Sequence, residues 1–402
     1  MTQSPSSPRI VILGGGFAGL YTALKLDELA WDTTPTIILA DQRDRFVFAP
    51  LLYELVTGEL ETWEVAPLYA DLLASTSVQF QQRMVSGVDV DNRMVYFDGA
   101  DPQPYDYLVL GLGGETPLDI VPGAAEHAIP FRTVDDAYRL KQLLHRLEES
   151  DRDRIRVAVV GGGYSGVELA CKLSDRLGER GRIRIIEMAD QILGTSTDFN
   201  RDAANKALED CGVWIDLETK VAQVEGESIS LEYREQVDTI PVDVVLWTVG
   251  TKVPDVVTHL PLEKTDRQQL LTTPTLQVAN HTEIFALGDS AEIYDASGDR
   301  VPVTAQAALQ EAQFTAWNIW AAATNRPLLP FRYQHLGEMM SLGMDNATLT
   351  GLGVTLDGPM AHVARRLAYL YRMPTLDHQV KVGLNWVTRP IRDLLALQRP
   401  AP

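Results

Sequence analysis

The stretch RIVILGGGFAGLYTA at residues 9–23 decides the fold. Its aliphatic run predicts a buried strand, its glycines predict a tight turn, and the residues after them predict a helix. In such a turn the first glycine allows the bend, the second lets the backbone approach a pyrophosphate, and the third lets the helix pack on the strand. The positive end of the helix dipole then faces the phosphates. The stretch therefore predicts a dinucleotide-binding unit.

A near copy, RVAVVGGGYSGVELA, occupies residues 156–170. After each copy comes a second strand that ends in an acid, which is suited to accept hydrogen bonds from a ribose diol. A single such turn could be merely structural, but two units with matching spacing predict two dinucleotide sites. The predicted binding residues are Gly14, Gly16, Phe17, Ala18, Gly19 and Asp41 in the first unit, and Gly161, Gly163, Gly166 and Glu187 in the second.

The predicted fold class is α/β, with two Rossmann-like dinucleotide-binding domains and a C-terminal amphipathic helical region. In flavoproteins with two dinucleotide sites, the N-terminal unit usually holds FAD and the inserted unit holds NADH or NADPH as substrate. The segment EIFALGDSAE supports this order, because in such proteins a strand followed by Gly288 and Asp289 closes the FAD domain. The expected ranges are 1–115 and 271–325 for the FAD-binding domain, 150–255 for the NAD(P)H-binding domain, and 326–402 for a region of membrane association or dimerisation.

Composition narrows the class of protein. The 402 residues are 45% hydrophobic and carry a net charge of −20, which favours a globular chain and argues against nucleic acid as a partner. Cys171 and Cys211 lie far apart in sequence, so we expect packing residues, no metal site and no redox-active cysteine pair. The leader MTQSPSSP leaves no room for a signal peptide, and no run of 18 apolar residues predicts a membrane span.

The sequence resembles the type II NAD(P)H:quinone oxidoreductases over nearly its whole length. The segments that carry the resemblance are GGGFAG at 14–19, FVFAPLLYELVTGEL at 46–60, GGGYSGVELA at 161–170, ALGDSA at 286–291 and AQAALQEA at 305–312. The resemblance implies FAD-dependent oxidation of NAD(P)H and two-electron reduction of a membrane quinone without proton pumping. The longer segment FVFAPLLYELVTGELETWEVAP at 46–67 especially resembles a cyanobacterial and plastid branch that reduces demethylphylloquinone-type or plastoquinone-type quinones.

The resemblance also implies three catalytic residues. The AQxxxQ segment of the family lies beside the flavin where quinone docks, and here it supplies Gln306 and Gln310, four residues apart on one helix face. The glutamate of the second glycine motif, Glu168, is expected near the nicotinamide and flavin, where it orients the ring or relays protons. From the residues alone, the two glutamines could be ordinary helix-surface residues, and Glu168 could simply favour the helix dipole.

The C-terminal region is predicted to contact the membrane. Two segments separated by Pro374 carry apolar residues at helical spacing: Met360, Val363, Leu367, Leu370 and Tyr371, then Val380, Leu384, Val387, Ile391 and Leu394. Residues 359–402 contain seven Lys or Arg and two Asp, which favours anionic lipid headgroups. We therefore expect a cytoplasmic protein peripherally associated with the inner or thylakoid membrane; docking of this helix pair at a domain or homodimer interface is the alternative.

Two other functions remain open from the sequence. One is a soluble FAD-dependent reductase that passes electrons to a ferredoxin- or rubredoxin-type protein, and the other is a non-enzymatic flavin redox sensor. For the nicotinamide, Glu187 is expected to repel a 2′-phosphate, so NADH should be accepted at least as well as NADPH. Arg182 or Arg184 could alter that balance.

Overall fold

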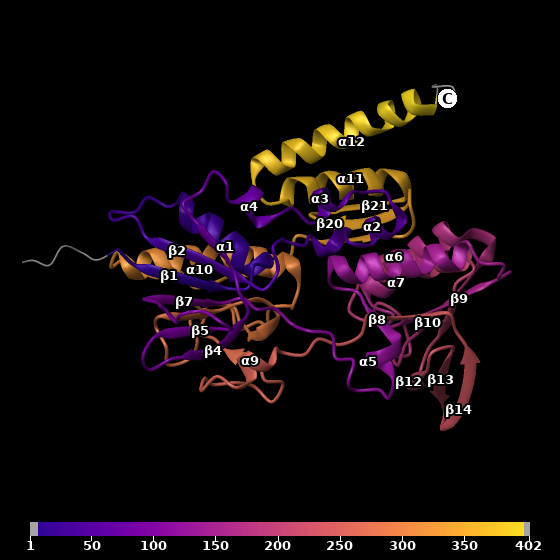
Figure 1. Ribbon diagram of the computed structural model, residues 1–402, viewed down its shortest axis with the longest axis horizontal. Helices are drawn as coiled ribbons and strands as arrows, with labels where there is room; N and C mark the ends of the chain where they lie inside the picture. The colour runs from indigo at the N-terminus through magenta and orange to yellow at the C-terminus, as the bar shows by residue number, and fades with distance from the viewer. Residues whose placement is uncertain (1–6, 398–402) are drawn as a thin grey trace, which may run out of the picture. The chain divides into compact units, whose positions relative to one another are not determined.

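A computed structural model describes residues 7–397, with the side chains of residues 7–389. Most of the leader MTQSPSSP, residues 1–6, therefore lies outside the described residues. The chain forms two compact units, each built from several stretches of sequence (Figure 1). The first unit comprises the chain up to Val47, Ala66–Glu115 and Thr251–Gln334. The second comprises Phe48–Val65, Thr116–Gly250 and the chain from His335 onward.

The first unit is built on a five-stranded parallel sheet in the order β17-β7-β1-β2-β3. Its strands are β1 (Arg9–Leu13), β2 (Thr36–Asp41), β3 (Gln79–Gln82), β7 (Tyr107–Leu110) and β17 (Ile284–Ala286). Helices α1 (Phe17–Glu28) and α10 (Ala305–Ala323) pack together, and the indole of Trp320 donates to the carbonyl of Ala30 at 2.9 Å. After Arg9, the four residues of the central strand β1 are aliphatic, and all four are buried.

The second unit repeats this plan with a five-stranded parallel sheet in the order β11-β10-β9-β15-β8. Its strands are β8 (Ala128–Pro130), β9 (Ile155–Val160), β10 (Gly181–Ile186), β11 (Trp214–Asp216) and β15 (Val244–Trp247). Its helices are α2 (Tyr53–Thr57), α3 (Thr62–Val65), α5 (Ala124–His127), α6 (Val134–Glu148), α7 (Tyr164–Leu177) and α8 (Asp198–Asp210). The α/β class with two Rossmann-like units is thereby confirmed.

Smaller sheets complete both units. In the first unit these are an antiparallel sheet of β4 (Val85–Asp89), β5 (Met94–Phe97) and β6 (Gln103–Pro104), and a pair of β16 (Leu270–Leu271) and β18 (Ala291–Glu292). Short helices there are α4 (Tyr69–Leu72) and α9 (Asp255–Thr258). In the second unit, β12 (Lys220–Val224), β13 (Ser228–Tyr233) and β14 (Gln236–Pro241) form a meander that packs its apolar side chains on the parallel sheet.

The C-terminal part of the chain joins the second unit. A sheet of β19 (Glu338–Ser341), β20 (Ala347–Gly351) and β21 (Val354–Asp357) packs on helix α11 (Gly358–Arg372), and helix α12 (Leu376–Leu397) follows α11 (Figure 1). Pro374 lies between these helices, as the sequence predicts. Among residues 7–397, no helix combines the length and the apolar character that a bilayer span requires.

The two glycine turns have the same geometry. Gly14 and Gly161 adopt φ values of +94° and +111°, a region that favours glycine. A Cβ on Gly19 would stand 1.8 Å from the carbonyl oxygen of Gly14, whereas a Cβ on Gly16 would meet nothing within 4 Å. The close approach of helix to strand therefore requires glycine at the third position, while the second position borders open space.

Replacing Gly19 or Gly16 by alanine should have different effects on the stability of the protein. Gly19→Ala forces a Cβ into a backbone oxygen that cannot move aside, so we expect a loss of about 3 kcal/mol in stability. Gly16→Ala should leave the unfolding midpoint in urea near that of the wild type. Equal midpoints for the two variants would contradict this account of the turn.

A buried acid supports the turn that follows β17. Glu311, on α10, accepts a hydrogen bond from the backbone N–H of Gly288 at 2.8 Å, and its side chain is buried. Burial raises the pKa of Glu311 to about 7, with the N–H of Gly288 acting against this shift and the charge of Asp289 adding to it. The folded unit therefore favours the protonated form of this carboxyl.

This raised pKa predicts a loss of stability with rising pH. The unfolded chain ionises Glu311 near its ordinary pKa of about 4.5, so stability falls between there and about pH 7, by about 3 kcal/mol in total. Glu311→Gln should remove this decline and make the protein more stable than the wild type at pH 8, with little difference at pH 4.5. Urea unfolding across this range tests it; the exposed Glu263→Gln is the control and should track the wild type.

Candidate active site

Hydrogen bonds to an acid and a tyrosine fix the backbone of the first glycine turn. The N–H of Gly15 donates to Asp41 Oδ2 at 2.7 Å, and the hydroxyl of Tyr69 donates to the carbonyl of Gly15 at 2.8 Å. Helix α1 begins after Gly16 without a side-chain cap, so its first N–H groups have no side-chain acceptor at the cap. Space beside Gly16 and an uncapped helix start suit a pyrophosphate.

Phe17 and Ala18 lie at the start of α1. The ring of Phe17 meets the ring of Phe46 edge to face, with centroids 5.2 Å apart. Gly288, in the left-handed region at φ +70°, is close enough to Ala18 that a Cβ on Gly288 would stand 3.6 Å from the Ala18 Cβ. The structure therefore places Gly288 and the neighbouring Asp289 beside the first glycine turn.

The second glycine turn repeats the arrangement in the second unit. The N–H of Gly162 donates to Glu187 Oε2 at 2.7 Å, and Glu187 Oε1 accepts from the N–H of Ala189 at 2.8 Å. Helix α7 also starts without a side-chain cap, and a Cβ on Gly163 would meet nothing within 4 Å. A carboxylate offers about four acceptor positions, so Glu187 keeps capacity for a ribose hydroxyl while holding the turn.

Gln306 and Gln310 lie on one face of α10, but neither is a free surface residue. The side-chain amide of Gln310 donates to the carbonyl of Gln334 at 2.9 Å and accepts from its N–H at 3.0 Å. The hydroxyl of Tyr333 donates to Gln306 Oε1 at 3.0 Å. Both glutamines therefore fasten residues 333–334 to α10, a role that the sequence pattern did not indicate.

Glu168 lies on α7 in a buried hydrogen-bond network. Its Oε1 accepts from the hydroxyl of Tyr53 at 2.7 Å and from the backbone N–H of Ser341 at 2.8 Å. The guanidinium of Arg365, on α11, in turn donates to the Tyr53 hydroxyl. Burial raises the pKa of Glu168 above its usual range, although the Arg365 charge and these hydrogen bonds act in the opposite direction.

Two further acids balance the charges around this network. Arg365 is fully buried and pairs with the equally buried Glu54 at 3.0 Å, which Arg366 also contacts at 2.7 Å. Burial alone would raise the pKa of Glu54, but the two guanidinium groups bring it below its usual value. Lys172 pairs with Glu59 at 2.5 Å. No sequence motif singles out these residues; Tyr53, Glu54 and Glu59 fall inside the segment at 46–60, which is their only signal in the sequence.

The C-terminal helices expose apolar side chains and hide much of their charge. The exposed apolar residues are Met360, Val363, Leu367 and Tyr371 on α11 and Leu376, Val380, Leu384 and Val387 on α12; Leu370 is half-buried. The side chains of Ile391 and Leu394 lie outside the described residues. Because Arg365 is buried, Arg366 pairs with Glu54 and Lys381 pairs with Asp377, the charge count of residues 359–402 overstates the charge presented to a surface.

The two cysteines lie in contact, away from any cluster of metal-ligating side chains among the described residues. No group of three or more metal-ligating side chains occurs in the described part of the chain. Cys171 and Cys211 are free thiols, yet they contact each other: their hydrogen bond raises the pKa of Cys171 well above its usual value and lowers that of Cys211. The distance between them in sequence gave no sign of this contact.

Comparison with known proteins agrees with this geometry. Residues 8–312 match the family model for pyridine nucleotide-disulphide oxidoreductases. Demethylphylloquinone reductase NdbB of Synechocystis sp. is 56% identical over 399 residues, which cover 98% of this chain and 99% of that protein. The chloroplastic/mitochondrial alternative NAD(P)H-ubiquinone oxidoreductase C1 of Arabidopsis thaliana is 45% identical, covering 97% of this chain and 82% of that protein.

The solved structure of NDH2 from Plasmodium falciparum in complex with NADH superimposes with a TM-score of 0.84 at 17% identity, covering 95% of this chain and 98% of that one. At that identity the likeness concerns the fold. The two sequence relatives go further, because they match this chain almost from end to end, and they confirm the resemblance seen in the motifs. The chain belongs to the pyridine nucleotide-disulphide oxidoreductase family and, within it, to the type II NAD(P)H:quinone oxidoreductases.

Proposed function

We propose that the chain uses bound FAD to oxidise NAD(P)H and reduce a membrane naphthoquinone of the demethylphylloquinone type. When bound, FAD would supply the redox chemistry, as acceptor of a hydride from the nicotinamide and donor of two electrons to the quinone. Each turnover consumes NAD(P)H, one proton and a quinone, and yields NAD(P)⁺ and a quinol. The proposal assigns FAD to the predicted ranges 1–115 and 271–325 and the nicotinamide to 150–255.

The observation that carries the proposal is the duplicated turn. Gly16 and Gly163 each border open space at an uncapped helix start, and each turn has an acid at the end of the next strand. Two such turns allow one dinucleotide to reduce another. Neither Asp41 nor Glu187 is fully used by the backbone, so both keep acceptor positions for ribose hydroxyls.

The quinone is proposed from the relatives. One is named for demethylphylloquinone and the other for ubiquinone, and the first is more similar to this chain. A plastoquinone is the alternative within the same reaction. Neither relative's name supports a ferredoxin- or rubredoxin-type acceptor or a non-enzymatic sensor.

Glu168 is proposed to carry the proton that the reaction consumes. Burial raises the pKa of this carboxyl and so favours its protonated form, which is the form that a general acid needs. Tyr53 and Arg365 are positioning residues in this scheme, because the Tyr53 hydroxyl orients the carboxyl and Arg365 orients the hydroxyl. Gln306 and Gln310 are proposed to line the inner end of the quinone site.

The exposed apolar face of α11 and α12 is proposed to rest on the bilayer, with the protein on the cytoplasmic side of the inner or thylakoid membrane. The eight exposed apolar side chains on two amphipathic helices support this placement, since a lipid-soluble quinone must be collected from the bilayer. Their apolar area, rather than the largely paired basic residues, is expected to supply most of the binding energy. A homodimer remains a prediction.

Anaerobic stopped-flow absorbance tests the function and the quinone site together. In the wild type, NADH should bleach the flavin, and a short-chain naphthoquinone should restore its colour. Gln310→Leu should slow the restoration at least about tenfold while leaving the bleaching within about twofold, a difference near 1.4 kcal/mol.

Gln313→Leu, an exposed position on the same helix, is the control and should change neither half-reaction. Loss of FAD or equal slowing of both half-reactions in Gln310→Leu would assign Gln310 only to fastening residues 333–334. A preparation that binds no FAD, or a reduced flavin that quinone fails to reoxidise, would overturn the function itself.

The proton role of Glu168 predicts a change in the pH profile. Activity should fall as pH rises through the raised pKa of Glu168, because the protonated form is needed. Tyr53→Phe removes a hydrogen bond that favours the carboxylate, so this decline should move to higher pH. Glu168→Gln should abolish the decline and lower kcat about 100-fold.

The measurement is kcat against pH with saturating NADH and quinone, and the exposed Tyr96→Phe is the control. A purely structural role for Glu168 would lower thermal stability in Glu168→Gln while keeping the shape of the pH profile.

A further inference from the structure

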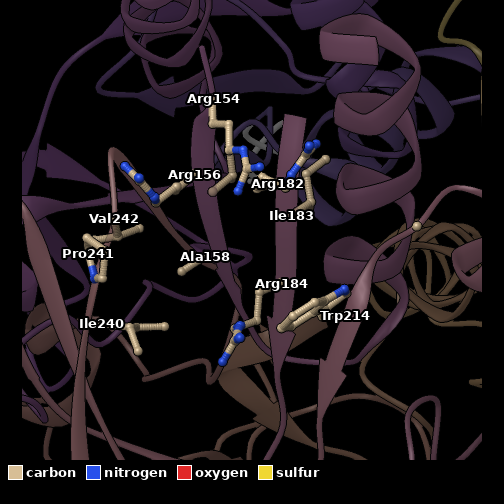
Figure 2. Close-up of a pocket in the computed structure, with 12 residues that line it drawn as sticks. Arg154, Arg156, Ala158, Arg182, Ile183, Arg184, Trp214, Ile240, Pro241 and Val242 are labelled. Atoms are coloured by element: carbon tan, nitrogen blue, oxygen red, sulfur yellow. The ribbon is translucent and has the colours of Figure 1, made fainter. Parts of the chain in front are cut away.

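A cavity of about 270 Å³ lies in the second unit, at the start of strands β9 and β10. Four arginines line it: Arg154 just before β9, Arg156 in β9, and Arg182 and Arg184 in β10 (Figure 2). Arg156 and Arg182 are register partners in the sheet, and Arg184 is the partner of Trp214 on β11. Because side chains alternate along a strand, Arg182 and Arg184 share one face of the sheet.

Two of these arginines have no acidic partner. The Arg154 side chain makes no hydrogen bond or ion pair with any residue that the structure describes, and the Arg182 guanidinium donates only to the carbonyls of Glu179 and Gly181 within that part of the chain. Guanidinium groups bind carboxylate and phosphate groups well, because they form two parallel hydrogen bonds with them. Both side chains are exposed and therefore available to an anion that enters the cavity.

The other two arginines are only partly neutralised. Arg184 pairs with Asp216 at 3.1 Å, and its guanidinium stands 5.1 Å from the ring centroid of Trp214. Arg156 lies 3.9 Å from Asp243, whose Oδ1 is taken by Arg152 and whose Oδ2 accepts the backbone N–H of Arg156. Two acids therefore face four arginines in a chain whose net charge is −20.

The first unit provides an internal comparison. Arg9 starts β1 as Arg156 starts the repeated sequence in β9, and Asp106 stands where Asp243 does, bonded to the backbone N–H of its arginine. There Arg9 closes on Asp106 with side-chain hydrogen bonds of 3.0 and 2.8 Å. In the second unit Arg152 forms the close ion pair with Asp243 instead. The guanidinium of Arg156 is therefore less tightly paired and lines the cavity.

On strand β10, the second unit has arginines where the first unit has uncharged residues. In the aligned strands TIILAD and RIRIIE, Thr36 corresponds to Arg182 and the buried Ile38 corresponds to Arg184. The strands need no arginine at these places to form the sheet. The arginines of β10 are therefore a feature of the second unit that the repeated fold does not explain.

The cavity is separate from the predicted dinucleotide site. That site lies where β9 and β10 end, at Gly161 and Glu187, whereas the arginines cluster where these strands begin. Gly161 lies five positions after Arg156, or about 16 Å along the strand at the usual rise per residue. A ligand of the cavity would thus occupy the opposite edge of the same sheet.

We propose that this cavity binds a small aromatic anion, with one or two rings and a carboxylate or phosphate group. The guanidinium groups of Arg154, Arg156 and Arg182 would hold the anionic group. The ring would lie against apolar side chains such as Ala158 and Ile240 and near the flat face of Trp214, which is 67% exposed. A volume slightly below the usual range of about 300–1,000 Å³ for ligand pockets limits the size of the ring system.

Calorimetric titration of the FAD-loaded protein at low salt tests the chemistry. The probes are 2-naphthoate and 1-naphthyl phosphate, compared with neutral 2-naphthol and with inorganic phosphate. We expect one acid to bind with 1:1 stoichiometry at least about tenfold more tightly than either half-ligand, and the tighter of the two acids identifies the head group. Equal binding of 2-naphthol and the acids would overturn the proposal.

Variants locate the site. Arg154→Gln and Arg182→Gln should each weaken binding about tenfold, and Trp214→Leu should weaken it as well, with FAD content unchanged. Arg139→Gln, an exposed arginine on α6 of the same unit, is the matched control and should bind like the wild type. Displacement of the acid by NAD⁺, or an equal loss in Arg139→Gln, would place binding elsewhere and overturn the proposal.

Discussion

The hydrogen bond from a glycine N–H to the acid at the end of the next strand sets the geometry on which both units depend. Asp41 holds the turn at Gly15, and Glu187 holds the turn at Gly162 at the same distance of 2.7 Å. With the turn fixed, the third glycine brings the helix against the strand, and the helix start points at the open space beside the second glycine. The acid thus has two tasks that do not compete, because a carboxylate has acceptor positions for both the turn and a ribose.

A second constraint is the set of charges buried around Glu168. Removing Glu54 and Arg365 from water costs several kcal/mol for each ion, and their mutual attraction offsets this cost only when geometry is good and remaining donors are paired. The arrangement is therefore weak as a source of stability but strong as a way of fixing positions. Arg365 on α11 orients Tyr53, and Tyr53 orients Glu168 on α7. The proton affinity of one carboxyl consequently depends on three separate elements of the second unit.

Local patterns in the sequence predicted the parts of the structure that local chemistry determines. The glycine spacing, the aliphatic strands and the acids after them carry their geometry with them, so the two parallel sheets and their order of turns could be expected. Glu54 and Arg365 lie 311 residues apart, and no local sequence pattern around either residue predicts that they pair. The same holds for Glu311 beneath Gly288 and for the contact of Cys171 with Cys211. The sequence also could not show which basic C-terminal residues are buried or paired, as Arg365 and Arg366 are, because burial in three dimensions decides which charges reach the surface.

The duplication also separates what the fold requires from what one copy has added. Both units keep the carboxylate that accepts the N–H of the first residue of the repeated strand, at Asp106 and at Asp243, so this contact belongs to the sheet itself. Only in the first unit does the arginine on that strand close fully on its acid. In the second unit Arg152 pairs with Asp243, so Arg156 on β9 is less tightly paired with that acid. On the adjacent strand, Arg182 and Arg184 stand where the first unit has a threonine and a buried isoleucine. Unneutralised like charges so close together repel one another, so an arrangement that keeps them implies a compensating anion rather than a contribution to folding.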